Sequence, residues 1–87
     1  MVVKLVYEKA AVKALMRMQP KIATAIRDAL EEIAADPFAK HPNVKPLVGG
    51  EDSFRYRRGD WRAVYWLDRP ADEMVVTWIG SRGDAYR

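Results

Sequence analysis

The sequence predicts an α+β domain in which two helices cover one face of an antiparallel β-meander, with a further strand at the N-terminus. Two segments in the first half have apolar residues at helical spacing, and three later segments are rich in β-branched and aromatic residues. Short turn sequences separate these three segments. The order strand, helix, helix, strand, strand, strand favours helices gathered on one sheet face, with the other face partly open.

The first half of the chain is expected to form one strand and a helical hairpin. Residues 2–7 are rich in β-branched side chains and predict a short strand. From Ala11 to Met18 apolar residues recur at i, i+3, i+4 and i+7, which is the spacing of an amphipathic helix. Pro20 interrupts this helix and suits the first turn of a second one, which Asp36-Pro37 ends.

Residues 37–53 connect the helices to the meander. The segment is rich in proline and glycine and predicts an irregular surface connection, in which Val44, Leu47 and Val48 pack back against the core. His41 is the only histidine and lies in this segment, where an exposed residue is more usual than a catalytic base. We therefore assign His41 no role.

Three extended runs form the expected meander. They cover residues 54–58, 61–67 and 74–79, with turns at 59–60 and 68–72. Gly59-Asp60 is a glycine-first two-residue turn, and a hairpin closed by it sets Arg57 opposite Arg62. A slip of one residue would move Arg62 to the other face, so the placement of the arginines depends on this turn.

Period-2 alternation gives the predicted hairpin two chemically different faces. The face expected to cover the helices carries Phe54, Tyr56, Ala63 and Tyr65. The other face carries Arg55, Arg57 and Arg62, with Val64 and Trp66. Directly opposed like charges are unfavourable by up to about 1 kcal/mol, so this cluster needs a counter-charge. Acids of the chain such as Glu51 or Asp84 are one source, and a bound phosphate, whose oxygens match the guanidinium fork, is the other.

Other strand residues keep alternatives open. Trp61, Trp66 and Trp78 occupy positions typical of core or partner-facing residues, with stacking on RNA as the less favoured alternative. Gly80 is expected to serve a turn after the last strand.

Size and composition narrow the class of protein. The chain has 87 residues, of which 49% are hydrophobic, so we expect one compact domain over residues 1–87. It has no cysteine, which excludes disulfides and cysteine-based metal or catalytic sites and fits a cytoplasmic location. It has no run of about 18 apolar residues, so no membrane segment is expected. The formal charge of +3 suits an anionic partner.

The sequence also resembles a known family over essentially its whole length. The helical hairpin, the stretch KPLVGGEDSFRYRRGDWRAVYWL and the ending IGSRGDAYR resemble the RelE/ParE superfamily of toxins from type II toxin-antitoxin systems. The segment GDWRAVY and the terminal pattern G-x-R-x-x-x-Y are the most specific parts. The resemblance implies a RelE-like fold and one of two activities. RelE-like members are ribosome-dependent endoribonucleases (mRNA interferases), which attack the phosphate with the ribose 2′-hydroxyl without a metal, whereas ParE-like members inhibit DNA gyrase.

The RelE-type resemblance also implies a set of site residues and no cofactor or metal. Arg62, Arg82 and Tyr86 match the catalytic positions. The two arginines are expected to hold the scissile phosphate, and Tyr86 to stack on a base or donate its proton, unless it simply docks on the sheet. Arg55 and Arg57 are expected to bind the flanking RNA phosphates.

The chain departs from the commoner RelE-type pattern at two places. Ser81 stands where many relatives carry histidine, and the pair Arg55 and Arg57 stands where others carry lysine. Serine is a poor base and arginine stays protonated up to about pH 12, so no residue is an obvious proton acceptor. A third reading is therefore a catalytically weak toxin that mainly binds its antitoxin.

The resemblance implies a cognate antitoxin as a partner, besides the ribosome and mRNA. An acidic, apolar antitoxin segment is suited to the arginines, by strand addition or by a helix laid in a groove. In such systems the antitoxin usually carries the DNA-binding part, so this chain alone is not expected to bind operator DNA. No membrane partner is expected.

Overall fold

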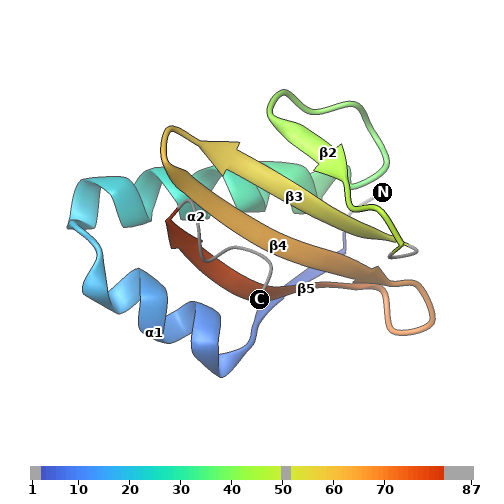
Figure 1. Ribbon diagram of the computed structural model, residues 1–87. Coiled ribbons are helices and arrows are strands. Elements are labelled where there is room, and N and C mark those ends of the chain that lie inside the picture. The colour runs from blue at the N-terminus through green and yellow to red at the C-terminus, as the bar shows by residue number, and fades with distance from the viewer. Residues whose placement is uncertain (1–2, 50–51, 82–87) are drawn as a thin grey trace.

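The computed structural model describes residues 3–49 and 52–81. In these ranges the elements are β1 (Lys4–Tyr7), α1 (Lys9–Arg17), α2 (Pro20–Ala35), β2 (Val44–Pro46), β3 (Ser53–Arg58), β4 (Trp61–Asp68) and β5 (Glu73–Ser81). The strands form one five-stranded sheet in the order β1-β5-β4-β3-β2, and both helices lie on the same side of it (Figure 1). The predicted α+β class is confirmed.

The two helices begin and end where the sequence pattern predicts. Arg17 lies in the last turn of α1, where a cation is favourable beside the negative end of the helix dipole. Pro20 occupies the start of α2, where its missing N–H removes no intrahelical hydrogen bond. Each helix buries one apolar stripe against the sheet, with Ala11 from α1 and Ile26, Leu30 and Ile33 from α2. Neither helix in the described ranges is both long and apolar enough to cross a membrane.

The sheet is mixed because β1 pairs in parallel with β5, whereas the remaining pairs are antiparallel. Leu5 lies opposite Met74 in this parallel pair. The backbone N–H of Glu8 extends the contact by donating to the carbonyl oxygen of Val76. The N-terminal strand is therefore held by β5, the last strand of the described ranges.

The short strand β2 lies within the segment that the sequence predicts to be irregular. It pairs with β3 at the edge of the sheet, and Pro46 is tolerated there because an edge strand needs fewer backbone donors. Val44 packs against the core and Leu47 is partly buried, as expected. Val48 is fully exposed, so the expectation that it packs on the core is wrong.

The β3–β4 hairpin has the predicted register. Gly59 has a φ of 58°, a left-handed conformation that glycine adopts without strain. Arg57 lies opposite Arg62, and Phe54 lies opposite Tyr65. The rings of Phe54 and Tyr65 stack with their centroids 5.4 Å apart.

The core lies between the helices and one face of the sheet. Tyr56, Ala63 and Tyr65 of the hairpin are buried there, as the alternation predicts. They pack with Leu30 of α2 and Val76 of β5, neither of which has any exposed surface. Burial of apolar surface stabilises by about 25 cal/mol per Å², so this side of the hairpin holds the hairpin against the helices.

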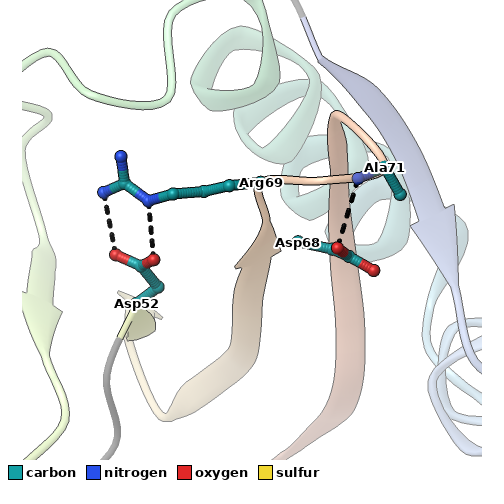
Figure 2. Close-up of polar contacts among 4 residues, drawn as sticks. All are labelled: Asp52, Asp68, Arg69 and Ala71. Carbon is teal, nitrogen blue, oxygen red and sulfur yellow. Dashed lines mark hydrogen bonds and ion pairs between the residues drawn. The ribbon is translucent and has the colours of Figure 1, made fainter.

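An exposed ion pair joins the two connections at the far end of the hairpin (Figure 2). Arg69 donates from Nε to Asp52 Oδ2 at 2.7 Å and from Nη2 to Asp52 Oδ1 at 3.0 Å. The same guanidinium lies over the ring of Phe38, 4.6 Å from its centroid. Nearby, the N–H of Ala71 donates to Asp68 Oδ1 and closes the β4–β5 turn. The hydrogen bond from Arg69 lowers the pKa of Asp52.

We predict that Asp52→Asn lowers the urea midpoint of unfolding near pH 7. Because the pKa of Asp52 is lowered in the folded state, the ion pair stabilises the protein above the unfolded pKa and this stabilisation is lost as pH falls. The difference between variant and wild type should therefore shrink towards zero at about pH 2. Asparagine tolerates the φ of 57° at this position, so the substitution removes the charge and one of the two acceptor oxygens of Arg69 without straining the backbone.

Asp28→Asn is the control for this experiment. Asp28 is exposed on α2 and forms no ion pair within the described ranges. A pH-independent effect of Asp52→Asn, or an equal effect of both substitutions, would contradict a stabilising role for the ion pair.

Candidate functional site

The sheet face opposite the helices brings the predicted arginines together. We call it the open face and define it by side chains of β3, β4 and β5 that alternate with the core residues. Its members are Arg55, Arg57, Arg62, Val64, Trp66, Val75, Trp78 and Gly80. The face is basic at the end nearest the β3–β4 turn, where Arg57 and Arg62 oppose each other. The prediction that Arg55, Arg57 and Arg62 share one face is confirmed.

The arginines of the open face differ in their surroundings. Arg57 is exposed, and its Nε donates to the carbonyl oxygen of Gly59 at 3.2 Å. Arg62 is partly buried, and its Nη1 is shielded from solvent without a hydrogen-bond partner among the described residues. A shielded donor without an acceptor costs about 1–3 kcal/mol. A ligand that supplies an acceptor oxygen would recover this free energy.

The charges of Arg57 and Arg62 are not neutralised by the described part of the chain. The ion pair found there joins Arg69 to Asp52, at the other end of the hairpin. Two other residues expected at the site, Arg82 and Tyr86, lie outside the described residues, as do the acids Glu51 and Asp84. The opposed pair on the open face thus retains the need for a counter-charge that the sequence predicts.

A β-bulge in β5 shapes the rest of the open face. Val64 lies opposite Trp78 and Tyr65 lies opposite Val76, so Thr77 is an extra residue in β5. Thr77 Oγ1 donates to the carbonyl oxygen of Val64 at 3.4 Å. Val76 and Ile79 are both buried in the core although they are three residues apart. The bulge therefore turns Trp78 onto the open face, whereas uninterrupted alternation after Val76 would have pointed it into the core.

The indole of Trp78 lies over the backbone of Gly80. A Cβ atom at Gly80 would collide with Cη2 and Cζ2 of the indole. Since Gly80 lies opposite Arg62, the ring fills the space that a side chain opposite Arg62 would occupy. The expectation that Gly80 serves a turn is wrong, because Gly80 lies within β5 and makes room for Trp78.

The described tyrosines and the histidine are poorly suited to proton transfer at the open face. Burial raises the pKa of Tyr65 to about 12, and its side chain points into the core. Burial also raises the pKa of Tyr7, against the opposing effect of Arg27. His41 is partly buried rather than exposed, and its Nε2 donates to the carbonyl oxygen of Asp36 at 2.6 Å.

The position of His41 also separates it from the arginines. It lines a hollow with Ile33 and Tyr56, which belong to the side of the sheet that the helices cover. His41 therefore lies on the helix-covered side of the sheet, away from the open face. Within the described ranges, no group of three or more carboxylate or imidazole side chains is arranged to hold a metal ion.

The fold is that of a RelE-like toxin. The isolated RelE toxin of E. coli superimposes with a TM-score of 0.82 at 17% identity, covering 98% of this chain and 89% of that one. RelE in the RelE–RelB complex of Pyrococcus horikoshii gives a TM-score of 0.80 at 23% identity, covering 98% and 100%. The RelBE2 toxin-antitoxin complex of Mycobacterium tuberculosis contains a chain with a TM-score of 0.75 at 23% identity, covering 94% and 100%.

The family follows from the sequence. The model of the family described as ParE toxin of type II toxin-antitoxin system, parDE, matches residues 5–86. The chain belongs to this family and is a RelE/ParE-type toxin of a type II toxin-antitoxin system. No curated protein sequence matches it significantly. The resemblance to the RelE/ParE superfamily is therefore confirmed at the level of family and fold.

The sequence patterns did not reveal the bulge or the place of Trp78. A usable signal was present, because a glycine inside a strand often marks a bulge or a close approach. Gly80 follows Trp78 by two residues, which is the spacing of neighbours on one face of a strand. The pair Trp78 and Gly80 is thus the feature that sequence reasoning missed.

We predict that Gly80→Ala destabilises the protein by about 1–3 kcal/mol, because the new methyl group overlaps the indole of Trp78. Urea denaturation measures the free energy of unfolding. In a Trp78→Ala background the same substitution should cost little, since the obstacle is gone. Equal costs in both backgrounds would show that the methyl group meets something other than the indole.

Proposed function

We propose that this toxin is a RelE-like, ribosome-dependent endoribonuclease that cleaves mRNA by attack of a ribose 2′-hydroxyl on the adjacent phosphate. The observation that carries the proposal is the opposed pair Arg57 and Arg62 on the open face, without an ion pair in the described ranges. Guanidinium groups match phosphate oxygens with two parallel hydrogen bonds. A sheet surface with opposed arginines is therefore suited to the RNA backbone.

The chemistry asks for three functions: a base for the 2′-hydroxyl, a stabiliser of the charged phosphorane, and an acid for the leaving 5′-oxygen. We assign charge stabilisation to Arg62 and Arg82. The shielded Nη1 of Arg62 supports its place at the phosphate, because it lacks an acceptor among the described residues. Arg55 and Arg57 bind flanking phosphates, and Tyr86 stacks on a base or acts as the acid.

Few residues of this chain are candidates for the base. Tyr65 is buried with a pKa of about 12, and His41 lies on the helix-covered side. Ser81 ends β5 and is exposed, but a hydroxyl is a poor proton acceptor. Tyr86, the RNA or the ribosome is left to accept the proton.

A cognate antitoxin is the second partner in this proposal. RelE toxins from Pyrococcus horikoshii and E. coli have been crystallised with RelB antitoxins. In this chain a largely apolar hollow of about 470 Å³ lies between α1 and α2, and Met16 beside it is 79% exposed. This hollow suits an amphipathic antitoxin helix, whereas an acidic segment suits the arginines of the open face. We expect the pair to act in the cytoplasm, with DNA binding left to the antitoxin.

A gyrase inhibitor is the alternative function. It is favoured by the description of the matching family, which names the ParE toxin of the parDE system. In that case the open face contacts a protein and performs no RNA chemistry. A catalytically weak toxin that mainly binds its antitoxin is the third reading, since Ser81 offers no good base.

We predict that the wild-type toxin cuts a defined message on translating ribosomes at discrete, codon-dependent positions. Arg62→Ala and Arg82→Ala should each slow cleavage by about a hundredfold or more, because they remove stabilisation of the phosphorane. Arg57→Ala should slow it less, because a positioning phosphate contact is lost. Cleavage rates under single-turnover conditions measure these effects.

Arg17→Ala, on the exposed end of α1, is the matched control and should leave the rate unchanged. Equal losses for Arg57→Ala and Arg82→Ala would contradict the division of roles. Intact message together with arrested gyrase would favour the alternative function, and neither effect would favour the antitoxin-binding module.

A further inference from the structure

We propose that Trp78 is the stacking surface for an RNA base next to the phosphate held by Arg62. The inference rests on the proposed nuclease function and deepens it, because it adds a residue that selects and positions the substrate. It is carried by three observations on β5: a bulge, a glycine that receives the indole, and the position of both opposite β4.

The bulge is the first observation. If Thr77 paired regularly and residues 76–79 alternated without a bulge, Trp78 would lie on the core face with Met74 and Val76. With the bulge, Trp78 lies on the open face, opposite Val64 and one row from Arg62. Bulges are common next to active sites, where they redirect a side chain. A tryptophan turned out of the core loses apolar burial, so a function on the outer face is the natural compensation.

The support of the ring is the second observation. One side of the indole rests on the backbone of Gly80, at a place where any other residue would displace it. The backbone of Gly80 therefore supports the ring from the sheet side. An aromatic ring supported in this way loses little conformational entropy when a base stacks on it.

The neighbours of the ring are the third observation. Gly80 lies opposite Arg62, so the indole over Gly80 lies beside the position on β4 from which the Arg62 side chain leaves the sheet. A nucleotide presents a charged phosphate and a planar base joined by a sugar, which is the same pairing of charge and aromatic surface. Grooves that combine cations with aromatic rings are the usual means of binding single-stranded nucleic acid.

Trp66 provides a comparison on the same face. It is 37% exposed and lies opposite Val75, one row further from Arg62 than Val64 and Trp78. Val75 is only 7% exposed although it lies on the open face, away from the main core. Trp66 therefore belongs to an apolar area of the open face and not to the end where Arg57 and Arg62 lie. An apolar protein segment suits that area, whereas a base beside a phosphate suits Trp78.

The test measures single-turnover cleavage on ribosomes programmed with one message in three forms. One form is unmodified, and the others carry an abasic nucleotide directly before or directly after the cut. Trp78→Leu should slow cleavage of the unmodified message by about tenfold, as expected for one lost base stack. On one of the abasic messages the wild type and Trp78→Leu should react at the same rate within about twofold, since the stack is absent from both.

Two further variants separate stacking from packing. Trp78→Phe keeps an aromatic ring and should stay within about threefold of the wild type. Trp66→Leu makes the same change as Trp78→Leu one row away, and any effect it has on the rate should be equal on all three messages, because no base stacks on Trp66. A loss for Trp78→Leu that is equal on all three messages would overturn the inference and give Trp78 a purely structural role. An unaltered rate would overturn it as well.

A binding measurement distinguishes failure of the inference from failure of the nuclease proposal. A labelled 2′-O-methyl oligonucleotide lacks the attacking hydroxyl, so it reports binding without cleavage. Should the wild type leave messages intact yet bind this oligonucleotide more tightly than its abasic counterpart, with the preference lost in Trp78→Leu, the inference stands and the nuclease proposal fails. Binding without any preference for bases in the wild type overturns the inference, and Trp78 is then a contact for protein.

Discussion

The register of the β3–β4 hairpin is the constraint on which the rest of the structure depends. Gly59 allows a two-residue turn, and the turn fixes which residue of β3 lies opposite which residue of β4. Tyr56 and Ala63 then cover the helices, whereas Arg57 and Arg62 oppose each other on the other face. Since side chains alternate strictly, a shift of one residue would bury arginines and expose the core. The free energy of core burial thus holds two like charges side by side.

The bulge at Thr77 makes a second adjustment to the same sheet. It lets Val76 and Ile79 both face the core while Trp78 faces outwards. Regular pairing would make these three positions alternate and would bury the indole. One extra residue therefore gives the open face an aromatic ring without removing an aliphatic residue from the core. On β5, the residues of one face pack in the core, whereas the residues of the other face belong to the open face.

How much could be predicted from the sequence follows from the range of the forces involved. Helix ends at Pro20 and Asp36, and the hairpin register set by Gly59, depend on local backbone chemistry and were predicted. The strand β2 spans only three residues, and the outward turn of Trp78 depends on how β5 pairs with β4, so local sequence patterns did not reveal either. The same distinction applies to the site. Arg55, Arg57 and Arg62 were grouped correctly because all three lie in one hairpin, whose register depends on a local turn.

The parallel pairing of β1 with β5 has a consequence for the order in which the toxin is made. β1 pairs with no strand except β5 in the described sheet, and Leu5 must wait for Met74 to be synthesised. Bringing together residues so far apart in the sequence costs conformational entropy before the contact contributes any stabilisation. A nascent chain that contains the β3–β4 arginines but lacks β5 has no Trp78 on the open face, and its core lacks the residues of β5. The basic surface therefore takes its final shape only after almost all of the toxin has been translated.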